Sequence, residues 1–378
     1  MKKITILFMM LILVFTIVAC KKESNTDTEP IDDGVFRVVL LVNGNLGDMS
    51  FFDSANEGIN RLNEAYPTDF EATTIEMGTN QTNWETTLYR VSDQNYDLII
   101  VATTQMREML QRVSKFRPNQ KYIIFDTEIE DNRADLYPNV HSIIFRQNEG
   151  GFLAGVLAAK MANGTSGMSA PVQATGKVGF VGGMRNNIIY DFAVGYAHGI
   201  QYVNELDDDP TSLMTSYVGN FSDSTQAKAL ANIQYSSQAD VIFVAASQAG
   251  LGVIDEAQTQ SRYVIGVDSD QYAYYKDSNP DRAELIVTSV IKNVGDVIFE
   301  SVSAHLDNEL DFGTLVSYGI AEGIIDLANN ENYAAKVPEE LRTFISGLRD
   351  EIISGELVVK SRFNMTLDEM DALFDSLQ

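Results

Sequence analysis

Short apolar runs alternate with amphipathic stretches along most of this chain, and the alternation forms two successive series. Continuous Val, Ile and Leu runs, such as 36–42, 97–102 and 240–245, are typical of strands covered on both faces, as in parallel sheets. Strand–helix–strand alternation at this spacing predicts βαβ units, and two series predict two doubly wound α/β lobes. The predicted strands are 36–42, 70–77, 97–102, 121–125 and 140–145, followed by 177–181, 213–218, 240–245 and 263–267.

Amphipathic stretches between these strands predict helices at 51–66, 84–93, 106–116, 151–161, 188–204, 225–235 and 253–259. Ser50 followed by Asp53 predicts a start like a capping box for the first of them, with Asp in place of the usual Glu or Gln. The rhythm changes after 268. There we expect a strand at 285–290, a helix at 292–305, a strand and turn at 316–325, and closing helices at 337–354 and 365–377.

The N-terminal segment has a different composition from the rest. Lys2 and Lys3 precede an apolar run of about 15 residues, short of the roughly 20 that a spanning helix needs, and Cys20 follows Ala19. This pattern predicts a lipoprotein signal peptide at 1–19 and an acylated Cys20 that holds the protein at a membrane outside the cytoplasm. The alternative is a degraded anchor helix in which Cys20 is incidental. Residues 20–34 carry few apolar side chains and predict a flexible tether.

Charge and metal-ligand content narrow the classes of partner. A formal net charge of −26 argues against nucleic acid, because a field of that sign repels polyanions. His141, His198 and His305 lie far apart in sequence, and a single cysteine excludes a structural zinc site in practice. We therefore expect no metal and no cofactor.

Catalysis is one function to weigh for a two-lobe α/β chain. The run DTEIED at 126–131 is an acidic cluster of a kind that holds calcium in nucleoside-cleaving hydrolases, but no second cluster with an acid–base partner accompanies it. The sequence has no Gly-x-Ser-x-Gly elbow and no Cys/His pair. GFVGGMRNN at 179–187 is glycine-rich but lacks the Gly-Lys-Ser/Thr ending of a phosphate loop. We expect no catalysis.

Ligands of doubly wound sheets bind outside the carboxyl ends of the strands. The residues that directly follow the predicted strands are therefore the candidates for a binding site. They are 43–52, 103–105, 126, 247–252 and 268–271.

Several runs, in order along the chain, resemble the basic membrane protein family of substrate-binding lipoproteins, which serve ABC transporters, and are similar to purine-nucleoside receptors. These runs are GNLGDMSFFDSANEG (44–58), EGGFLAG (149–155), GKVGFVGG (176–183), FAVGYAHGIQYVN (192–204), YVGNFSD (217–223), ADVIFVAA (239–246), IGVDSDQ (265–271) and TSVIKNV (288–294). The resemblance implies a type I periplasmic-binding fold, in which three crossings join two lobes. It divides the chain into lobe 1 (35–146 with 291–315) and lobe 2 (147–290 with 316–378).

The resemblance also implies roles for particular residues. Phe51 and Phe221 would stack on the two faces of a base. Asp126 follows from its position instead: it ends its predicted strand, would face the edge of the base, and can accept hydrogen bonds there. Asp268 matches a carboxylate that accepts from ribose hydroxyls, and Lys292 matches a lysine that donates to the ribose. Asp268 and Lys292 would offset each other's charge and leave a site suited to an uncharged nucleoside, which an ABC permease would receive when the lobes close.

The chain departs from the family pattern near this site. Asn43 stands where the family usually has Asp, and Asn both donates and accepts, so base preference could differ. Residues 245–250 replace a more glycine-rich turn, which makes Ser247, Gln248 and Gly250 further ligand-binding candidates. Two functions remain as alternatives: a receptor for another flat heterocycle such as riboflavin, and a sensory ligand-binding ectodomain.

Overall fold

The computed structural model describes residues 33–129, 135–165, 167–168, 171–207 and 210–378. Residues 34–378 form one compact unit. The predicted signal peptide (1–19), Cys20 and nearly all of the predicted tether lie outside the described residues. Within the described part of the chain, no helix has both the length and the apolar character that crossing a bilayer requires.

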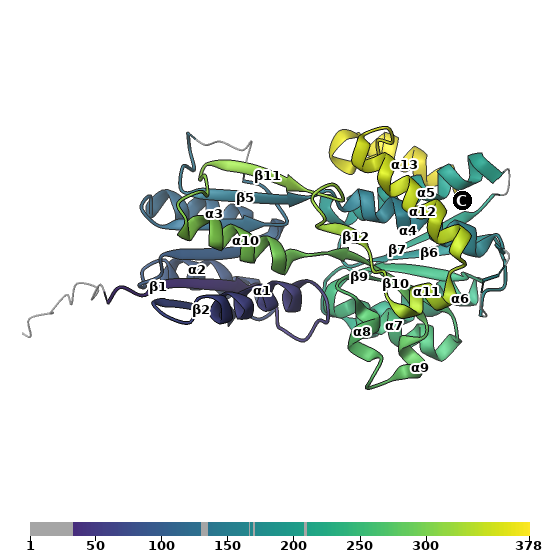
Figure 1. Cartoon of the computed structure of the whole chain (residues 1–378), viewed down its shortest axis with the longest axis horizontal. Coiled ribbons are helices and arrows are strands. Elements are labelled where there is room, and N and C mark those ends of the chain that lie inside the picture. The colour runs from purple at the N-terminus through teal and green to yellow at the C-terminus, as the bar shows by residue number, and fades with distance from the viewer. Residues whose placement is uncertain (1–32, 130–134, 166, 169–170, 208–209) are drawn as a thin grey trace, which may run out of the picture. The chain divides into compact units, whose positions relative to one another are not determined.

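Lobe 1 is built on a six-stranded parallel sheet (Figure 1). Its strands, in the order β11-β5-β4-β3-β1-β2, are β1 (Phe36–Val42), β2 (Phe70–Glu76), β3 (Leu98–Ala102), β4 (Lys121–Phe125), β5 (Val140–Phe145) and β11 (Thr314–Tyr318). Its helices are α1 (Phe51–Ala65), α2 (Trp84–Val91), α3 (Thr104–Phe116) and α10 (Val294–Leu306). Alternate residues of β1 pack against α1 on one face and against α2 and α3 on the other, which explains its unbroken apolar run.

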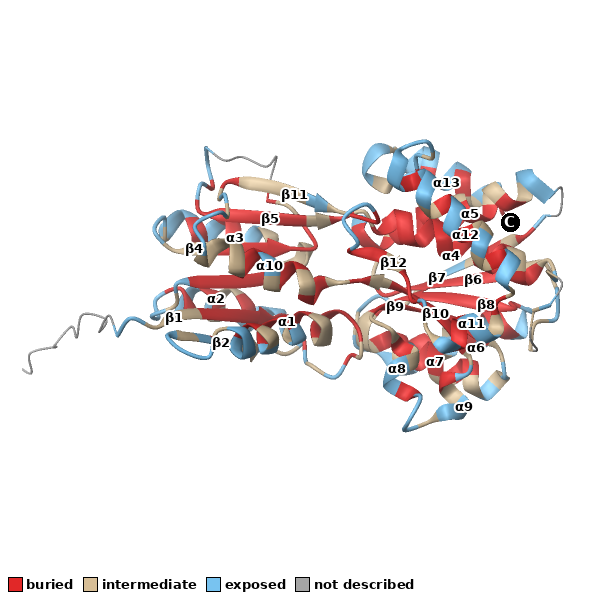
Figure 2. Ribbon diagram, in the orientation of Figure 1, coloured by how far each residue is buried: buried red, intermediate tan, exposed pale blue. Residues whose placement is uncertain are grey.

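Lobe 2 is built on a second six-stranded sheet, in the order β12-β10-β9-β8-β6-β7. Its strands are β6 (Lys177–Gly182), β7 (Ser212–Tyr217), β8 (Val241–Ala245), β9 (Tyr263–Asp268), β10 (Ile286–Lys292) and β12 (Ile325–Leu327), of which β12 runs antiparallel. Its helices are α4 (Gln147–Ala162), α5 (Asn187–Asp207), α6 (Ser224–Ser236), α7 (Gly250–Gln260), α8 (Gln271–Tyr275), α9 (Pro280–Ala283), α11 (Glu331–Lys336), α12 (Glu339–Ser354) and α13 (Leu367–Asp375). The central strands of both sheets are buried, whereas the edge strands β2, β7 and β11 are only partly buried (Figure 2). The predicted α/β class with two doubly wound sheets is confirmed.

Three crossings connect the lobes, after Phe145, after Lys292 and after Tyr318. They are bound to one another, because the Arg146 N–H donates to Tyr318 O at 2.7 Å and the Asn293 N–H donates to Ile324 O at 2.9 Å. Pairing of β11 with β5 continues to Tyr318, so the third crossing begins a few residues after the boundary expected at 315.

Two features of lobe 2 differ from the predictions. Helix α4 begins at Gln147 rather than at 151. Gly150 and Gly151 weaken an isolated helix, but in the fold they allow close packing, of Gly150 on Val290 and Ile325 and of Gly151 on α5. A Cβ on Gly151 would lie 2.6 Å from Phe192 O, and one on Gly155 would lie 2.1 Å from Tyr196 O. Between β9 and β10, where no element was predicted, the chain forms the short helices α8 and α9.

Candidate ligand-binding site

A cavity of about 190 Å³ lies between the lobes, at the carboxyl ends of strands from both sheets. Lobe 1 contributes Asn43, Asn45, Phe51, Thr103, Gln105 and Asp126, and lobe 2 and its crossing contribute Met184, Asn186, Phe192, Asn220, Phe221, Ser247, Gln248, Asp268 and Lys292. The position of the cavity is the one that the topology of doubly wound sheets predicts.

Four of the cavity residues have left-handed backbone conformations that non-glycine residues rarely adopt. They lie at or just after the ends of four different strands: Thr103 (φ 73°), Asp126 (φ 63°), Ser247 (φ 48°) and Asp268 (φ 64°). Such conformations cost on the order of 1–3 kcal/mol each and persist where the surrounding structure enforces them, often at binding sites. In each case the chain turns sharply where the strand ends and leaves a polar side chain at the cavity.

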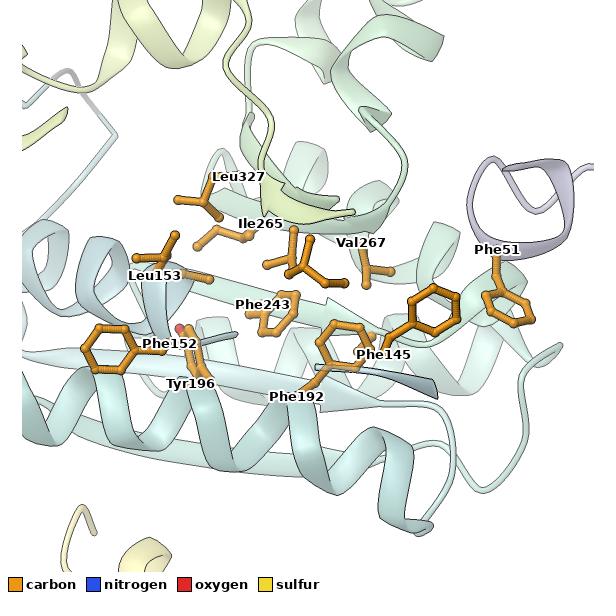
Figure 3. Packing of buried hydrophobic residues seen from close by; sticks show 14 of the residues in the cluster. Phe51, Phe145, Phe152, Leu153, Phe192, Tyr196, Phe243, Ile265, Val267 and Leu327 are labelled. Carbon is orange, nitrogen blue, oxygen red and sulfur yellow. The ribbon is translucent and has the colours of Figure 1, made fainter. Parts of the chain in front are cut away.

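Lys292 and Asp126 form a buried ion pair, in which Lys292 Nζ donates to Asp126 Oδ1. Lys292 is 1% exposed, and its ammonium lies 5.1, 4.8 and 5.5 Å from the ring centres of Phe51, Phe145 and Phe192. Figure 3 shows these three rings gathered at one end of the packed core. Burial raises the pKa of Asp126, and the nearby ammonium opposes that shift. Lys292 makes its hydrogen bond to Asp126, and its charge also lowers the pKa of Asp268, so it offsets the charge of Asp268 only in part.

Asp268 instead accepts a hydrogen bond from Ser50 Oγ at 2.5 Å. It is 6% exposed, and burial raises its pKa to about 7, although Lys292 and the Ser50 hydroxyl both lower it. The nearby carboxylates of Asp48 and Asp126 raise it further. The charge of Asp268 is thus only partly compensated by the protein, and it has capacity to accept hydrogen bonds from a ligand.

The raised pKa of Asp268 predicts a pH-dependent stability. Its usual pKa is 3.8 and its folded value is about 7, so the folded protein binds the extra proton between these values. The free energy of unfolding should therefore rise as pH falls from 8 toward 5, by at most about 1.4 kcal/mol per pH unit for one proton. Thermal unfolding of ligand-free protein from pH 5 to 8.5 measures this, and Asp268→Asn should show a shallower slope. Equal slopes in both proteins would contradict the assignment.

The start of α1 is capped by Asp48, not by the predicted Ser50–Asp53 pair. Asp48 accepts from the backbone N–H groups of Ser50, Phe52 and Asp53 at 3.0–3.1 Å, while the carboxylate of Asp53 accepts from Gly47 and Met49. Ser50 makes no capping bond with its side chain, because its hydroxyl bonds to Asp268. The cap therefore comes from a residue two positions before the N-cap, an arrangement that the capping-box pattern does not include.

The two predicted stacking residues both line the cavity, one from each lobe. Phe51 is 7% exposed, and its ring lies 5.2 Å from that of Phe52 and 5.4 Å from that of Phe125. Phe221 is half-buried, and its ring lies against Gly183, where a Cβ would approach it to 2.3 Å. Lobe 1 therefore fixes one ring firmly, whereas the other stands at the edge of lobe 2.

The remaining predicted residues have different positions. Asn43 Nδ2 donates to Thr103 Oγ1 at 2.9 Å, and its buried Oδ1 accepts no hydrogen bond from any described residue. Ser247 lines the cavity, but its hydroxyl donates to Asp48 at 2.7 Å. Gly250 is not among the described residues that line the cavity; it begins α7 beside Val244 and Ala246.

Sequence reasoning missed several polar residues of the cavity. Asn186 follows β6 in the glycine-rich run that lacks a phosphate-loop ending, and Asn220 follows β7. Both lie just beyond the carboxyl end of a strand, so the rule that selected Thr103 and Asp126 would also have selected them. Among the described residues, no cluster of three His, Cys, Asp or Glu side chains could hold a metal ion.

Known proteins with similar sequences and structures agree with this architecture. Residues 35–360 match the family described as "ABC transporter substrate-binding protein PnrA-like". Basic membrane protein A2 of Borrelia garinii subsp. bavariensis is 31% identical, over 87% of this chain and 89% of the relative. A Lactococcus lactis protein named "ABC transporter nucleoside-binding protein BmpA" is 28% identical, over 86% of this chain and 88% of its own length.

The fold matches solved structures of the same kind. The crystal structure of an ABC transporter solute-binding protein from Aeropyrum pernix K1 superposes with a TM-score of 0.77 and 25% identity, covering 91% of this chain and 97% of that one. The resemblance read from the sequence runs is thereby confirmed. The chain belongs to the PnrA-like family of ABC transporter substrate-binding proteins, which are binding proteins and not enzymes.

Proposed function

We propose that this protein captures a purine nucleoside between its lobes and delivers it to the permease of an ABC importer. The observation that carries the proposal is the pairing of Phe51 from one lobe with Phe221 from the other, in a cavity that also holds Asp268. Two aromatic rings on opposite walls suit a flat base, and a carboxylate that has capacity to accept suits vicinal hydroxyls. The name of the Lactococcus relative supports the same ligand class.

Each polar group has a defined part in this proposal. Asp268 accepts from the ribose hydroxyls, and Lys292, which already donates to Asp126, offers its remaining N–H groups to the sugar. The Oδ1 atom of Asn43 accepts an N–H of the base edge, which would satisfy a buried acceptor that has no partner among the described residues. The lysine cation of the cavity is already paired, which argues against an anionic ligand.

We further propose that an acyl group on Cys20 holds the protein at the extracytoplasmic face of the membrane. The support is the Lys2–Lys3 start, the short apolar run and the Ala19–Cys20 junction. Mass spectrometry of the N-terminal peptide from membrane fractions would detect the lipid. Replacing Cys20 with Ser should abolish it, and an unprocessed wild-type N-terminus would contradict this part of the proposal.

Calorimetric titration tests the ligand class. The domain from Lys21 onward retains the whole compact unit and would be unfolded and refolded to remove bound ligand. Adenosine, guanosine, inosine, cytidine, riboflavin and ribose would each be titrated. Sub-micromolar binding of purine nucleosides supports the proposal, and the order of their affinities shows which base Asn43 favours. Tight binding of riboflavin alone, or silence for every nucleoside with an intact fold, would overturn it.

Truncation of Phe221 should weaken purine nucleoside binding with little effect on stability. Base–aromatic stacking contributes roughly 1–3 kcal/mol, so Phe221→Ala should raise the Kd by about 5- to 150-fold. The ring is half-buried, so the unfolding midpoint should change little. Phe363→Ala removes a ring that is 45% exposed and does not line the cavity, and it should leave the Kd unchanged. An unchanged Kd in Phe221→Ala would exclude stacking on this ring.

A further inference from the structure

Residues 48–50 of lobe 1 are hydrogen-bonded directly to lobe 2. Ser247 Oγ donates to Asp48 Oδ2 at 2.7 Å, and Ser50 Oγ donates to Asp268 Oδ2 at 2.5 Å. Ser269 Oγ donates to Ser50 O at 3.3 Å. Asp48 and Ser50 are fully buried, so water does not compete for these bonds in this structure.

Met49, in the middle of this segment, extends the contact. Its backbone is left-handed (φ 52°), and its carbonyl accepts from Gln271 Nε2 at 3.2 Å. Its side chain packs against a lobe 2 cluster formed by the α6–α7 face of the sheet. Gln271 is 2% exposed and also accepts from the Val267 N–H, so it is held rigidly. Three consecutive residues of one lobe are thus bound by four separate side chains of the other.

We propose that residues 48–50 form an interlobe latch that favours the closed cleft before ligand arrives, and that Ser50 is a positioning residue for the Asp268 carboxylate. The same segment leads directly into α1, whose first residue is Phe51. Closing the latch therefore brings the Phe51 ring and the oriented Asp268 into one cavity. The latch rests on the proposed closure of two lobes, but not on which ligand the cavity holds.

The latch biases an equilibrium between open and closed forms. When the lobes separate, water replaces the Ser247 hydroxyl as the donor to Asp48, and it replaces the Gln271 amide as the donor to the Met49 carbonyl. Removing both serine hydroxyls should therefore shift the ligand-free protein toward the open form. A ligand that bridges both lobes should still close the variant, since it supplies contacts of its own.

Distance measurements between spin labels on the two lobes test the latch in the absence of ligand. The domain from Lys21 onward contains no cysteine, so Thr82→Cys and Asn187→Cys introduce unique labelling sites. Both residues are exposed and directly follow cavity-lining residues, Gln81 and Asn186. We expect a short-distance population in the refolded, ligand-free parent, and a shift to longer distances in Ser50→Ala/Ser247→Ala.

Ser54→Ala is the matched control, because Ser54 lies one turn further along α1 and its hydroxyl accepts from the Gly295 N–H within lobe 1. It should leave the distances unchanged. Identical distributions in the parent and in Ser50→Ala/Ser247→Ala, with both proteins folded by circular dichroism, would overturn the latch. Because no nucleoside is present, that outcome is distinct from a failure of the proposed ligand class, which the titration reports.

Discussion

Lys292→Met is expected to lower the free energy of unfolding by about 3–5 kcal/mol, because it leaves the Asp126 carboxylate buried without its cation. Lys292 is 1% exposed and Asp126 is 8% exposed, so water compensates neither partner well. Chemical denaturation of the ligand-free domain at pH 8 measures the loss. The loss should shrink toward pH 5, since burial already raises the pKa of Asp126 and the unpaired carboxyl would then be protonated.

The double variant Asp126→Asn/Lys292→Met separates the ion pair from the packing of the lysine stem. Replacing both charges of a buried pair is often close to neutral, so the double variant should recover most of the stability that Lys292→Met loses. Lys276→Met serves as the surface control: its pair with Glu331 at 3.6 Å is exposed and should contribute less than about 1 kcal/mol. If the double variant lost as much free energy of unfolding as the two single variants lose together, the two charges would not be coupled.

Asp268→Asn is expected to weaken nucleoside binding strongly while it stabilises the ligand-free protein at pH 8. A hydrogen bond to a charged group contributes about 1.5–3 kcal/mol, so loss of one such bond should raise the Kd by roughly 10- to 150-fold. Stability should change in the opposite direction, because the variant no longer ionises a buried group whose folded pKa is about 7. Calorimetric titration and thermal unfolding of the same preparations measure both effects.

Ribose-modified ligands make this second test specific. A 2′,3′-dideoxynucleoside should bind the parent protein much more weakly than the ribonucleoside, and the two should differ little in Asp268→Asn. Asp270→Asn is the neighbouring control, because the Asp270 side chain accepts from Asn330 and does not line the cavity. If Asp268→Asn discriminated against the dideoxynucleoside as strongly as the parent does, the hydroxyls would bind elsewhere.

The strands and most helices could be predicted because buried parallel strands have continuous apolar runs, as β1, β3 and β8 do. The start of α4 could not be predicted, because Gly150 and Gly151 weaken a helix in isolation and are favoured only once β10, β12 and α5 pack against them. Likewise, α8 and α9 are too short to show a clear apolar period in sequence.

The candidate site divides in the same way. Phe51, Asp126, Phe221, Asp268 and Lys292 could be placed at one cavity from sequence, because strand ends in a doubly wound fold meet at one edge and the resemblance supplied the rest. The hydrogen-bond partners of these residues could not be predicted from the sequence. Lys292 bonds to Asp126 rather than to Asp268, and Ser50 bonds to Asp268 rather than capping α1. Both outcomes depend on distances between residues that are far apart in the chain.

The sequence by itself therefore determined the two-lobe α/β architecture, the family and the edge at which a ligand would bind, since these follow from local periodicity and order along the chain. Only the tertiary structure decided which buried charges compensate each other, that Asp48 rather than Asp53 caps α1, and that residues 48–50 join the lobes. The reason is physical: a buried polar group takes whichever partner the packing brings within hydrogen-bonding distance, and strand order and lobe closure fix that partner.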